Sequence, residues 1–421
     1  MIGTIADDFT GATDVAVALR RAGLRTLIFF DPPADTAGLP AHDAIVIALK
    51  SRTTQPGEAV RDSRLAFEAL RANGVRQVYY KFCSTFDSTP RGNIGPVLDM
   101  LADETGADTV VLTPSSPEHG RTQYLGHLFV DGELLAESPM RHHPLTPMTD
   151  SNLLRLLADQ TKRRVGLVPL RTVHDGVDAV SAAIEQARRG GVRYLIVDAV
   201  ASADLETVGR ALRDAPLVAG AAGLAGGLAA AAAAGRSAPA DTGDPFASTR
   251  AAVLAGSCSA MTLQQIDHLR MLGRPAHRLD ALAEPDPARL AAKALAWYDS
   301  LPGEEAPLIY SSVEPARLAQ IQARLGVERS AAVFETATGL IARGLVARGV
   351  RRIVSAGGET SGEVVSALGV RGGLIGPEVA VGVPWIYSTN EPRVALLLKS
   401  GNFGGPELLA TASAGSAAEA A

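Results

Sequence analysis

Cysteine, aromatic residues and excess charge are all scarce in this sequence. Only 2 of the 421 residues are cysteine and 5% are aromatic. This excludes a disulfide scaffold and any zinc cluster built on cysteine, and it suits a reducing cytoplasm. The 40 basic and 45 acidic side chains leave a formal net charge of −5, so the chain offers no electrostatic surface for nucleic acid or an anionic membrane. We therefore expect neither a nucleic-acid nor a membrane partner.

Long runs of large apolar side chains are missing as well. The sequence starts at Met1 without the basic residues and apolar stretch of a signal peptide. The uncharged segment Ala215–Gly235 is long enough to span a bilayer, but it consists mostly of alanine and glycine, which favour hydrocarbon far less than leucine does. We interpret it as a buried, alanine-rich helix and expect a soluble, cytoplasmic protein.

Glycine, by contrast, is abundant, with 42 of 421 residues against about 7% in average proteins. The length suits two or three domains, and 47% hydrophobic with 20% charged residues is typical of a globular protein. Short apolar runs alternate with helical patterns such as Ala59–Ala72 and Ala179–Arg189, which predicts an α/β fold with largely parallel sheets. The predicted strands are Ile2–Ala6, Thr26–Phe30, Ala44–Ala48, Gln77–Lys81, Thr109–Thr113, Tyr194–Asp198, Ala251–Gly256, Leu308–Ser311, Arg352–Ala356 and Val394–Lys399.

Two segments interrupt this alternation. Between Thr122 and Ser138, two runs flank Asp131-Gly132, a dipeptide suited to a tight turn, so we expect a β-hairpin inserted in the first domain. Residues 235–249 are rich in Pro, Gly, Ser and Asp and mark a domain boundary. We therefore predict two α/β domains with a cleft between them. The predicted bounds are 1–235 for the first domain, 236–249 for a linker, 250–412 for the second domain and 413–421 for a flexible tail.

The segment Ile2–Asp14 is a predicted strand followed by Asp7, Asp8 and a helix start. Ligands of open α/β sheets bind outside the carboxyl ends of the strands, and adjacent residues on extended backbone point in opposite directions. One carboxylate can thus face the crevice, to accept a proton or hold Mg²⁺, while backbone N–H groups hold the other. The alternative is that Asp8 or Thr10 only caps the helix, but two acids in succession favour the functional interpretation.

Two further regions carry candidate ligands for a small polyhydroxy acid. Lys81–Asn93 follows a strand and gathers hydroxyls, an acid and two cations, and its Arg91 suits a two-pronged grip on a carboxylate. A capped helix start with a surface arginine is the alternative. Cys83 has no partner cysteine and no activating base, and we interpret it as structural. The loops Ser115–Thr122 and Met140–Asp150 hold three histidines and two arginines. We favour an anion-binding lining over a metal site, because the histidines lack metal-ligand spacing, and over a solvated loop. The candidate acid-binding residues are Lys81, Ser84, Asp87, Arg91, His119, Arg121 and Arg141.

Three glycine-rich turns recur in the second domain, each after a predicted strand: Gly256–Thr262, Ser355–Gly362 and Ser400–Pro406. Glycine lets the backbone approach a ligand closely, and N–H groups at helix starts attract phosphate. We expect helices to begin at Leu263 after the first turn and at Pro406 after the third. Singly, each is an ordinary tight turn, whereas three in one domain favour a nucleotide-binding site.

Familiar short fingerprints are absent from the sequence. There is no G-x-x-x-x-G-K-[ST] phosphate loop, no G-x-G-x-x-G after the first strand and no G-x-S-x-G. A Walker phosphate loop and the usual α/β-hydrolase are thereby excluded, and the missing dinucleotide fingerprint counts against an NAD(P)-dependent oxidoreductase.

The combination of motifs resembles a known family, the four-carbon acid sugar kinases. The segments that carry the resemblance are Ala6–Ala12, Cys83–Gly95, Ser355–Gly362 and Lys399–Gly405, and those similar to the 3-oxo-tetronate kinase subgroup are His119–Thr122, Gly126–Phe129 and Met140–Thr149. The resemblance spans nearly the whole chain. It implies a sugar-acid-binding N-terminal domain, a nucleotide-binding C-terminal domain and ATP-dependent phosphorylation of a terminal hydroxyl. The chain departs from the family at Gly220–Gly223, where a hydroxyl residue is expected, so one contact is lost if that segment borders the cleft.

The resulting hypothesis is a kinase that converts a 3-oxo-tetronate to its 4-phosphate with Mg²⁺ and ATP. Asp8 or Asp7 would deprotonate or orient the hydroxyl, Arg91 and Arg121 would hold the carboxylate, and Lys399 would neutralise developing charge. The residues expected to contact ATP are Ser257, Ser259, Gly357, Gly358, Glu359, Thr360, Gly401 and Asn402. The alternatives are a kinase for erythronate or threonate, an NAD(P)-dependent sugar-acid oxidoreductase and a non-catalytic sugar-acid sensor. The sequence leaves open whether the protein forms a homo-oligomer.

Overall fold

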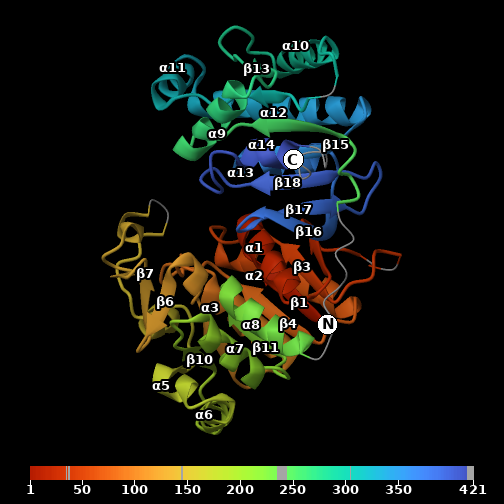
Figure 1. Cartoon of the computed structure of the whole chain (residues 1–421). Coiled ribbons are helices and arrows are strands. Elements are labelled where there is room, and N and C mark those ends of the chain that lie inside the picture. The colour runs from red at the N-terminus through yellow and green to blue at the C-terminus, as the bar shows by residue number, and fades with distance from the viewer. Residues whose placement is uncertain (35, 37, 144–145, 235–243, 304, 415–421) are drawn as a thin grey trace. The chain divides into compact units, whose positions relative to one another are not determined.

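The computed structural model describes residues 1–34, 36, 38–143, 146–234, 244–303 and 305–414. The chain forms two compact units, Met1–Ala240 and Asp241–Ala421 (Figure 1). Most of the predicted linker, residues 236–243, and most of the predicted tail, residues 415–421, lie outside the described residues.

The first unit is built on a sheet of parallel strands in the order β2-β3-β1-β4-β11-β5-β10-β9. Its central strands are fully buried, which is why β1 and β3 read as largely apolar runs rather than alternating ones. The strands are β1 Ile2–Ala6, β2 Thr26–Phe29, β3 Ala44–Ala48, β4 Gln77–Lys81, β5 Val110–Thr113, β9 Val165–Val168, β10 Tyr194–Val197 and β11 Leu217–Gly220.

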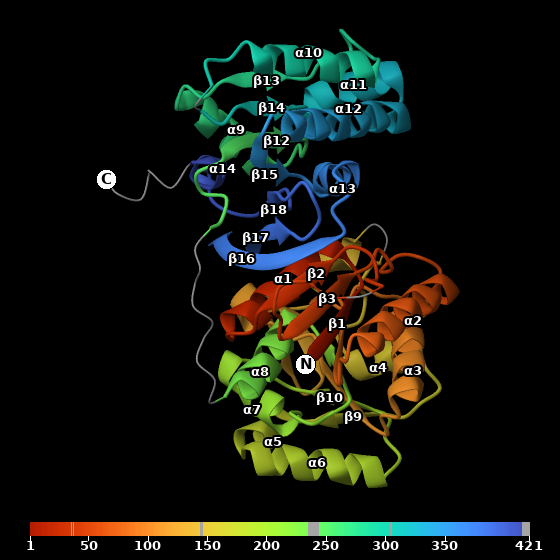
Figure 2. The same ribbon diagram turned by 90° about the vertical axis from the view of Figure 1, so that its right-hand side faces the viewer.

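Helices cover both faces of this sheet (Figure 2). Helix α1 packs on α8, and α8 on α7, along one face, while α2 packs on α3 along the other. The helices are α1 Phe9–Arg21, α2 Pro56–Ala72, α3 Ile94–Thr105, α4 Leu153–Ala158, α5 Leu170–His174, α6 Val177–Arg189, α7 Ser202–Ala211 and α8 Ala222–Ala233. Two short 3₁₀ helices, η1 Pro117–His119 and η2 Pro139–His142, lie in the loops after β5 and β8.

A separate antiparallel sheet is inserted after β5, with strands β6 Arg121–Tyr124, β7 His127–Val130 and β8 Glu133–Leu134. The predicted turn at Asp131-Gly132 is confirmed, with both residues at positive φ. The segment before it, however, is two strands rather than one. A second turn at Leu125-Gly126 divides them, also with both residues at positive φ, and leucine gives no sequence signal for that conformation.

The second unit has the strand order β13-β14-β12-β15-β18-β17-β16, in which the first five strands are parallel and β16 and β17 antiparallel. Helices α9 and α14 cover one face, and α10, α12 and α13 the other (Figure 2). The strands are β12 Arg250–Ala255, β13 Ala276–Arg278, β14 Leu308–Tyr310, β15 Val350–Ala356, β16 Gly372–Ala380, β17 Val383–Ser388 and β18 Ala395–Lys399. The helices are α9 Ala260–Met271, α10 Pro287–Asp299, α11 Pro315–Leu325, α12 Val327–Ala347, α13 Gly358–Ala367 and α14 Leu408–Ser413.

The predicted class, an α/β fold with largely parallel sheets, is confirmed, but several elements were missed. Strands β9, β11, β13, β16 and β17 were not predicted. The segment Ala215–Gly235 is not one helix, because its start forms strand β11 before α8 begins at Ala222. An apolar run of this length cannot be assigned to strand or helix by periodicity alone. No helix in the described part of the chain combines the length and apolarity of a membrane span.

Candidate active site

The acid cluster of the first unit lies where three adjacent strands end. Ala6 of β1 pairs in register with Ala48 of β3 on one side and with Lys81 of β4 on the other, so the loops after these strands leave from one edge. Helix α1 follows β1 on one face, whereas α2 and α3 follow β3 and β4 on the other. Ligands of open α/β sheets bind at the carboxyl edge where the helices change face in this way.

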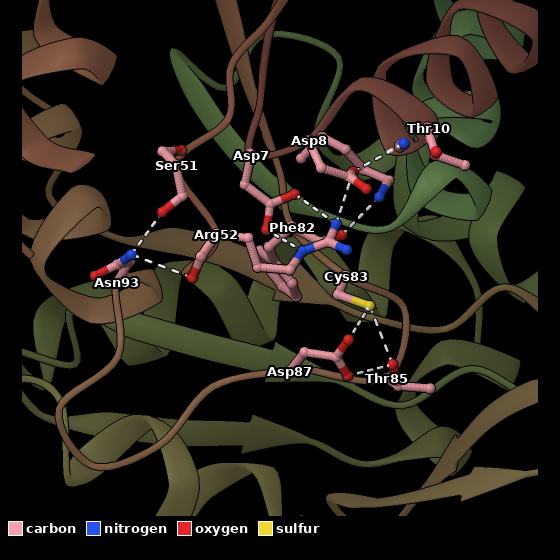
Figure 3. A network of polar contacts seen from close by, with 12 residues as sticks. Asp7, Asp8, Thr10, Ser51, Arg52, Phe82, Cys83, Thr85, Asp87 and Asn93 are labelled. Atoms are coloured by element: carbon pink, nitrogen blue, oxygen red, sulfur yellow. Dashed lines mark hydrogen bonds and ion pairs between the residues drawn. The ribbon is translucent and has the colours of Figure 1, made fainter. Parts of the chain in front are cut away.

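One arginine holds both acids of this cluster (Figure 3). Arg52 donates from Nε and Nη2 to the two oxygens of Asp7 at 3.0 and 2.8 Å, and its Nη2 also lies 2.7 Å from Asp8 Oδ1. The same Asp8 oxygen accepts the Gly11 N–H at 2.8 Å and caps α1. We expected backbone N–H groups to hold one acid and leave the other open. Instead Arg52, 45 positions along the chain, holds Asp7 and shares Asp8 with the helix start.

The two acids therefore differ in what remains available. Asp7 is 4% exposed and has a partner on each oxygen. Burial raises the pKa of Asp7, and the neighbouring Arg52 opposes that shift. Asp8 is partly exposed, and no donor among the described residues reaches its Oδ2. Of the two candidate bases, Asp8 is thus the one with an oxygen left for a ligand.

The loop that carries Arg52 is itself fixed by Asn93. The Asn93 amide donates to the backbone carbonyls of Ser51, Arg52 and Thr54 at 2.6, 3.2 and 3.0 Å (Figure 3). Sequence reasoning missed Arg52 and gave Asn93 no role. A weaker signal was present, because only two residues separate Ser51-Arg52 from the end of a predicted strand.

Lys81 and His119 extend the cluster on the side of α1. Lys81 is 3% exposed and donates from Nζ to the Phe82 carbonyl at 2.8 Å. A Cβ on Gly11 would lie 2.4 Å from Asp8 Oδ1 and 2.7 Å from Lys81 Nζ, so glycine is needed for these groups to approach one another. His119 lies with Nε2 4.0 Å from Asp14 Oδ1, and its Nδ1 is 3.1 Å from Ser116 Oγ. Burial raises the pKa of Asp14, a residue to which sequence reasoning gave no role, while Lys81 and His119 oppose the shift.

The loop after β4 forms a second small network. Cys83 Sγ donates to Asp87 Oδ2 at 3.1 Å and lies 3.0 Å from Thr85 Oγ1 (Figure 3). Burial raises the pKa of the Cys83 thiol, which agrees with a structural rather than a nucleophilic cysteine. Ser84 is half-buried in the same loop, and Arg91 is exposed.

The remaining two acid-site candidates lie near the inserted sheet. Arg121 starts β6, donates to the backbone carbonyl of His119 and lies 3.9 Å from Asp131. Arg141 in η2 is exposed and donates to the Ala136 carbonyl at 3.0 Å, so the structure ties it to its own loop rather than to the Asp8 cluster. Within the described ranges, no three His, Cys, Asp or Glu side chains are grouped to hold a metal ion.

The three glycine-rich turns of the second unit meet at one edge. Ala255 of β12 pairs with Ala356 of β15, which pairs with Lys399 of β18. The Gly256 and Ser257 N–H groups both donate to the Ala356 carbonyl, and the Gly357 N–H donates to the Lys399 carbonyl at 2.9 Å. Helices α9 and α13 leave β12 and β15 on opposite faces, the arrangement at which ligands of open α/β sheets usually bind.

The middle turn has the features of an anion-binding helix start. Gly357 caps α13 at φ +128° without a side-chain hydrogen bond, and the N–H groups of the first helical residues, Gly358 to Thr360, have no backbone acceptor there. A Cβ on Gly357 would lie 2.9 Å from Thr360 Oγ1 and 3.0 Å from the Ser257 nitrogen. A Cβ on Gly358 would meet nothing within 4 Å. The turn is therefore tightly packed at Gly357 and has open space beside Gly358.

The predicted starts of the helices after the other two turns are both wrong. The first helix starts at Ala260, capped by Ser259, rather than at Leu263, and the third starts at Leu408 rather than Pro406. Lys399 does not face a free phosphate position, because its Nζ is 2.9 Å from Thr262 Oγ1, 2.6 Å from Gln265 Oε1 and 2.9 Å from the Gly401 carbonyl. All three ammonium hydrogens are thus used within the protein.

Comparisons with known proteins cover both units. A family model described as a sugar-binding N-terminal domain matches residues 2–228, and one described as a nucleotide-binding C-terminal domain matches residues 252–409. The chain is 47% identical to a 3-oxo-tetronate kinase of Pseudomonas fluorescens over 98% of this chain and 96% of that protein. It is 45% identical to a 3-oxo-tetronate kinase of Methylobacterium radiotolerans over 98% of each. A solved structure from Salmonella typhimurium LT2 matches with a TM-score of 0.91 at 43% identity, over 98% of both chains.

Proposed function

Because the chain belongs to the 3-oxo-tetronate kinase family, we propose that it phosphorylates the terminal hydroxyl of a four-carbon 3-oxo sugar acid, with ATP as donor. This membership confirms the resemblance inferred from the sequence motifs and removes the oxidoreductase and the sensor as alternatives. Kinases for erythronate or threonate would perform the same chemistry and differ only in the acid they accept.

The observation that carries the nucleotide part of the proposal is the meeting of three glycine-rich turns at one sheet edge. The uncapped N–H groups at the start of α13 and the hydroxyls of Ser257 and Thr360 are donors suited to phosphate. The open space above Gly358 provides room for a ligand at that helix start. Gly401 lies against Ser257 and Ser259, because a Cβ there would come within 2.6 and 3.0 Å of their hydroxyl oxygens.

Mg²⁺ suits the same turn. Glu359 is exposed in the first turn of α13, beside the N–H groups proposed to bind phosphate. A carboxylate at that position repels phosphate unless a cation lies between them, and carboxylate and phosphate oxygens are the ligands that Mg²⁺ prefers. When bound, the ion would neutralise charge on the phosphates.

For the acid site we propose Asp8 as the group that accepts the hydroxyl proton, through Oδ2. Arg52 supports the charge of Asp8 from the other oxygen, and Lys81 adds a cation on the side of α1. Arg91 and Arg121 are proposed to hold the substrate carboxylate. Further polar contacts are proposed for Ser84, Asp87 and His119. Arg141 is exposed and hydrogen-bonded to its own loop, so it can take part only from the edge of the acid site. The two free cysteines, Cys83 and Cys258, support placing the reaction in the reducing cytoplasm.

A coupled ADP-release assay over a panel of four-carbon acids tests the substrate. We expect turnover with one enantiomer of a 3-oxo-tetronate and little with erythronate or threonate. Thermal protection by NAD(P) but not by ATP, or turnover of erythronate or threonate alone, would contradict the proposal.

Asp8→Asn tests the base. Asparagine caps a helix as well as aspartate does, and its amide can keep the acceptor for Gly11 while replacing Oδ2 by a donor. We expect kcat to fall by about 10²–10⁴-fold with the affinity for ATP unchanged. The matched control is Asp286→Asn, since Asp286 caps α10 by accepting the Arg289 N–H at 2.9 Å, and there activity should persist. An active Asp8→Asn enzyme would remove the base assignment.

A further inference from the structure

The loop between β18 and α14 is held to α9 through its backbone carbonyls. Ser259 Oγ and Thr262 Oγ1 donate to the Gly401 carbonyl at 2.6 and 2.8 Å, and Lys399 Nζ lies 2.9 Å from the same oxygen. Further along, the Gln265 amide donates to the carbonyls of Phe403 and Gly405 at 3.1 and 2.8 Å. Alternate carbonyls of residues 401–405 are thus all bonded toward the same helix.

This arrangement determines where the amide hydrogens of the loop point. In a trans peptide the C=O of one residue and the N–H of the next point in opposite directions. Since the carbonyls of Gly401 and Phe403 are bonded to side chains of α9, the N–H groups of Asn402 and Gly404 point away from α9. Neither N–H has an acceptor among the residues that the structure describes. The Phe403 N–H between them donates to the Ser400 carbonyl at 3.2 Å, so the two free N–H groups alternate along the loop. Backbone N–H groups without an acceptor attract anions.

Lys399 is the centre of this network. It is 1% exposed, and its three partners are Thr262 Oγ1, Gln265 Oε1 and the Gly401 carbonyl, all neutral. Because Lys399 donates to Gln265 Oε1, the NH₂ end of that amide is turned toward the loop carbonyls. One ammonium group thereby fixes Gly401 directly, and Phe403 and Gly405 through Gln265.

We propose that Lys399 is a positioning residue for the nucleotide: it holds the Ser400–Gly405 loop so that the Asn402 and Gly404 N–H groups face the phosphates, and it does not bind phosphate itself. The proposal rests on ATP binding at this sheet edge. Burying an ammonium group without a carboxylate partner costs free energy, which argues against a role limited to holding the fold together. A loop that has to present two amide hydrogens, by contrast, needs its carbonyls fixed.

Burial lowers the pKa of Lys399 to about 8, and no charged side chain contributes to that shift. Above this pH the neutral amine keeps only two hydrogens for three acceptors. We therefore expect the KM for ATP of the wild-type enzyme to rise as the pH passes 8, while the KM for the acid substrate does not follow it.

The test is to measure ATP binding by calorimetry and both KM values between pH 7 and 9 for the wild type and Lys399→Met. We expect Lys399→Met to raise the KM for ATP about tenfold or more, as for the loss of one charge-assisted hydrogen bond, with the KM for the acid unchanged and no further change above pH 8. Thr262→Val, which removes one partner, should raise the KM for ATP in the same direction, and Thr262→Ser, which keeps the hydroxyl, should not.

The outcomes separate this proposal from the proposed function. A wild-type enzyme that fails to bind ATP would overturn both. Normal ATP binding by the wild type, together with an unchanged KM for ATP in Lys399→Met and Thr262→Val, would overturn the positioning role alone. If Lys399→Met does not fold, the Thr262 pair and the wild-type pH profile decide in the same way.

Discussion

Replacing Arg52 by methionine removes the partner that both acids of the first unit share. Asp7 is 4% exposed, and its two oxygens accept from Arg52 at 3.0 and 2.8 Å. In Arg52→Met the Asp7 carboxylate has either to stay buried and unpaired or to take up a proton. Breaking one side of a buried ion pair costs roughly 3–5 kcal/mol.

Proton uptake sets the size and the pH dependence of that loss. An aspartate in an unfolded chain has a pKa of about 3.9, and keeping it protonated costs about 1.4 kcal/mol for each pH unit above that value. Arg52→Met should therefore lower the free energy of unfolding by at most about 4 kcal/mol at pH 7 and at most about 1.5 kcal/mol at pH 5, because burial already raises the pKa of Asp7 in the wild type. The direction of the pH dependence follows because the pKa of Asp7 in the folded variant lies above its value in the unfolded chain. The variant is therefore most stable at low pH and loses stability as the pH rises toward the pKa of Asp7 in the folded state.

Urea unfolding at the two pH values measures this effect. Far-ultraviolet circular dichroism follows the whole chain, whereas both tryptophans, Trp297 and Trp385, belong to the second unit, so their emission reports that unit separately. Adding Asp7→Asn to Arg52→Met removes the buried charge and should recover about 2 kcal/mol at pH 7, an interaction energy of the size seen for residues in contact. A loss below about 1 kcal/mol at pH 7, or an equal loss at both pH values, would refute the reasoning.

Two further predictions concern the turns and Asp14. Gly357→Ala should cost about 1–3 kcal/mol of stability, because φ is +128° and the new Cβ meets Thr360 and Ser257. The matched variant Gly358→Ala should be at least as stable as the parent, since nothing lies within 4 Å of the new Cβ. It should bind ATP more weakly if phosphate occupies that space. Thermal melts measure the stability and calorimetry the ATP binding, and unchanged ATP binding in both variants would contradict the proposed nucleotide site. Asp14→Asn should make the enzyme more stable at pH 7 and flatten the fall in stability from pH 4 to 7, because burial raises the pKa of Asp14 above its usual value. A variant less stable than the parent at pH 7 would show that burying this carboxylate does not destabilise the fold.

Two of the strands that end at the acid cluster were predictable because their signals are local. Ile2–Ala6 and Gln77–Lys81 match the structure at both ends, since the first stops at two aspartates and the second has a β-branched and aromatic centre between polar ends. Strands β11 and β17 escaped prediction for the opposite reason. Leu217–Gly220 merges into the alanine-rich helix that follows it. Val383–Ser388 pairs antiparallel with both of its neighbours and so lies outside the strand–helix alternation on which the prediction relied.

For the candidate sites, sequence reasoning identified segments better than roles. Asp8 and the glycine turns were named from their places after strands, a feature visible in any strand-to-helix connection. Lys399 was expected to meet developing charge on the ligand, but in the fold three neutral acceptors surround it. Which groups surround a side chain depends on elements far away in the chain, and no local pattern reports them.

By itself, then, the sequence determined the α/β class, the turns that follow key strands and the types of polar residue placed there, because turn chemistry and apolar runs act over a few neighbouring residues. Only the tertiary structure decided which of those turns share an edge. Arg52 reaches Asp7 across 45 positions and Lys399 reaches Gln265 across 134. Strand order and helix packing bring such residues together, and these depend on how the whole sheet buries its faces rather than on any one segment.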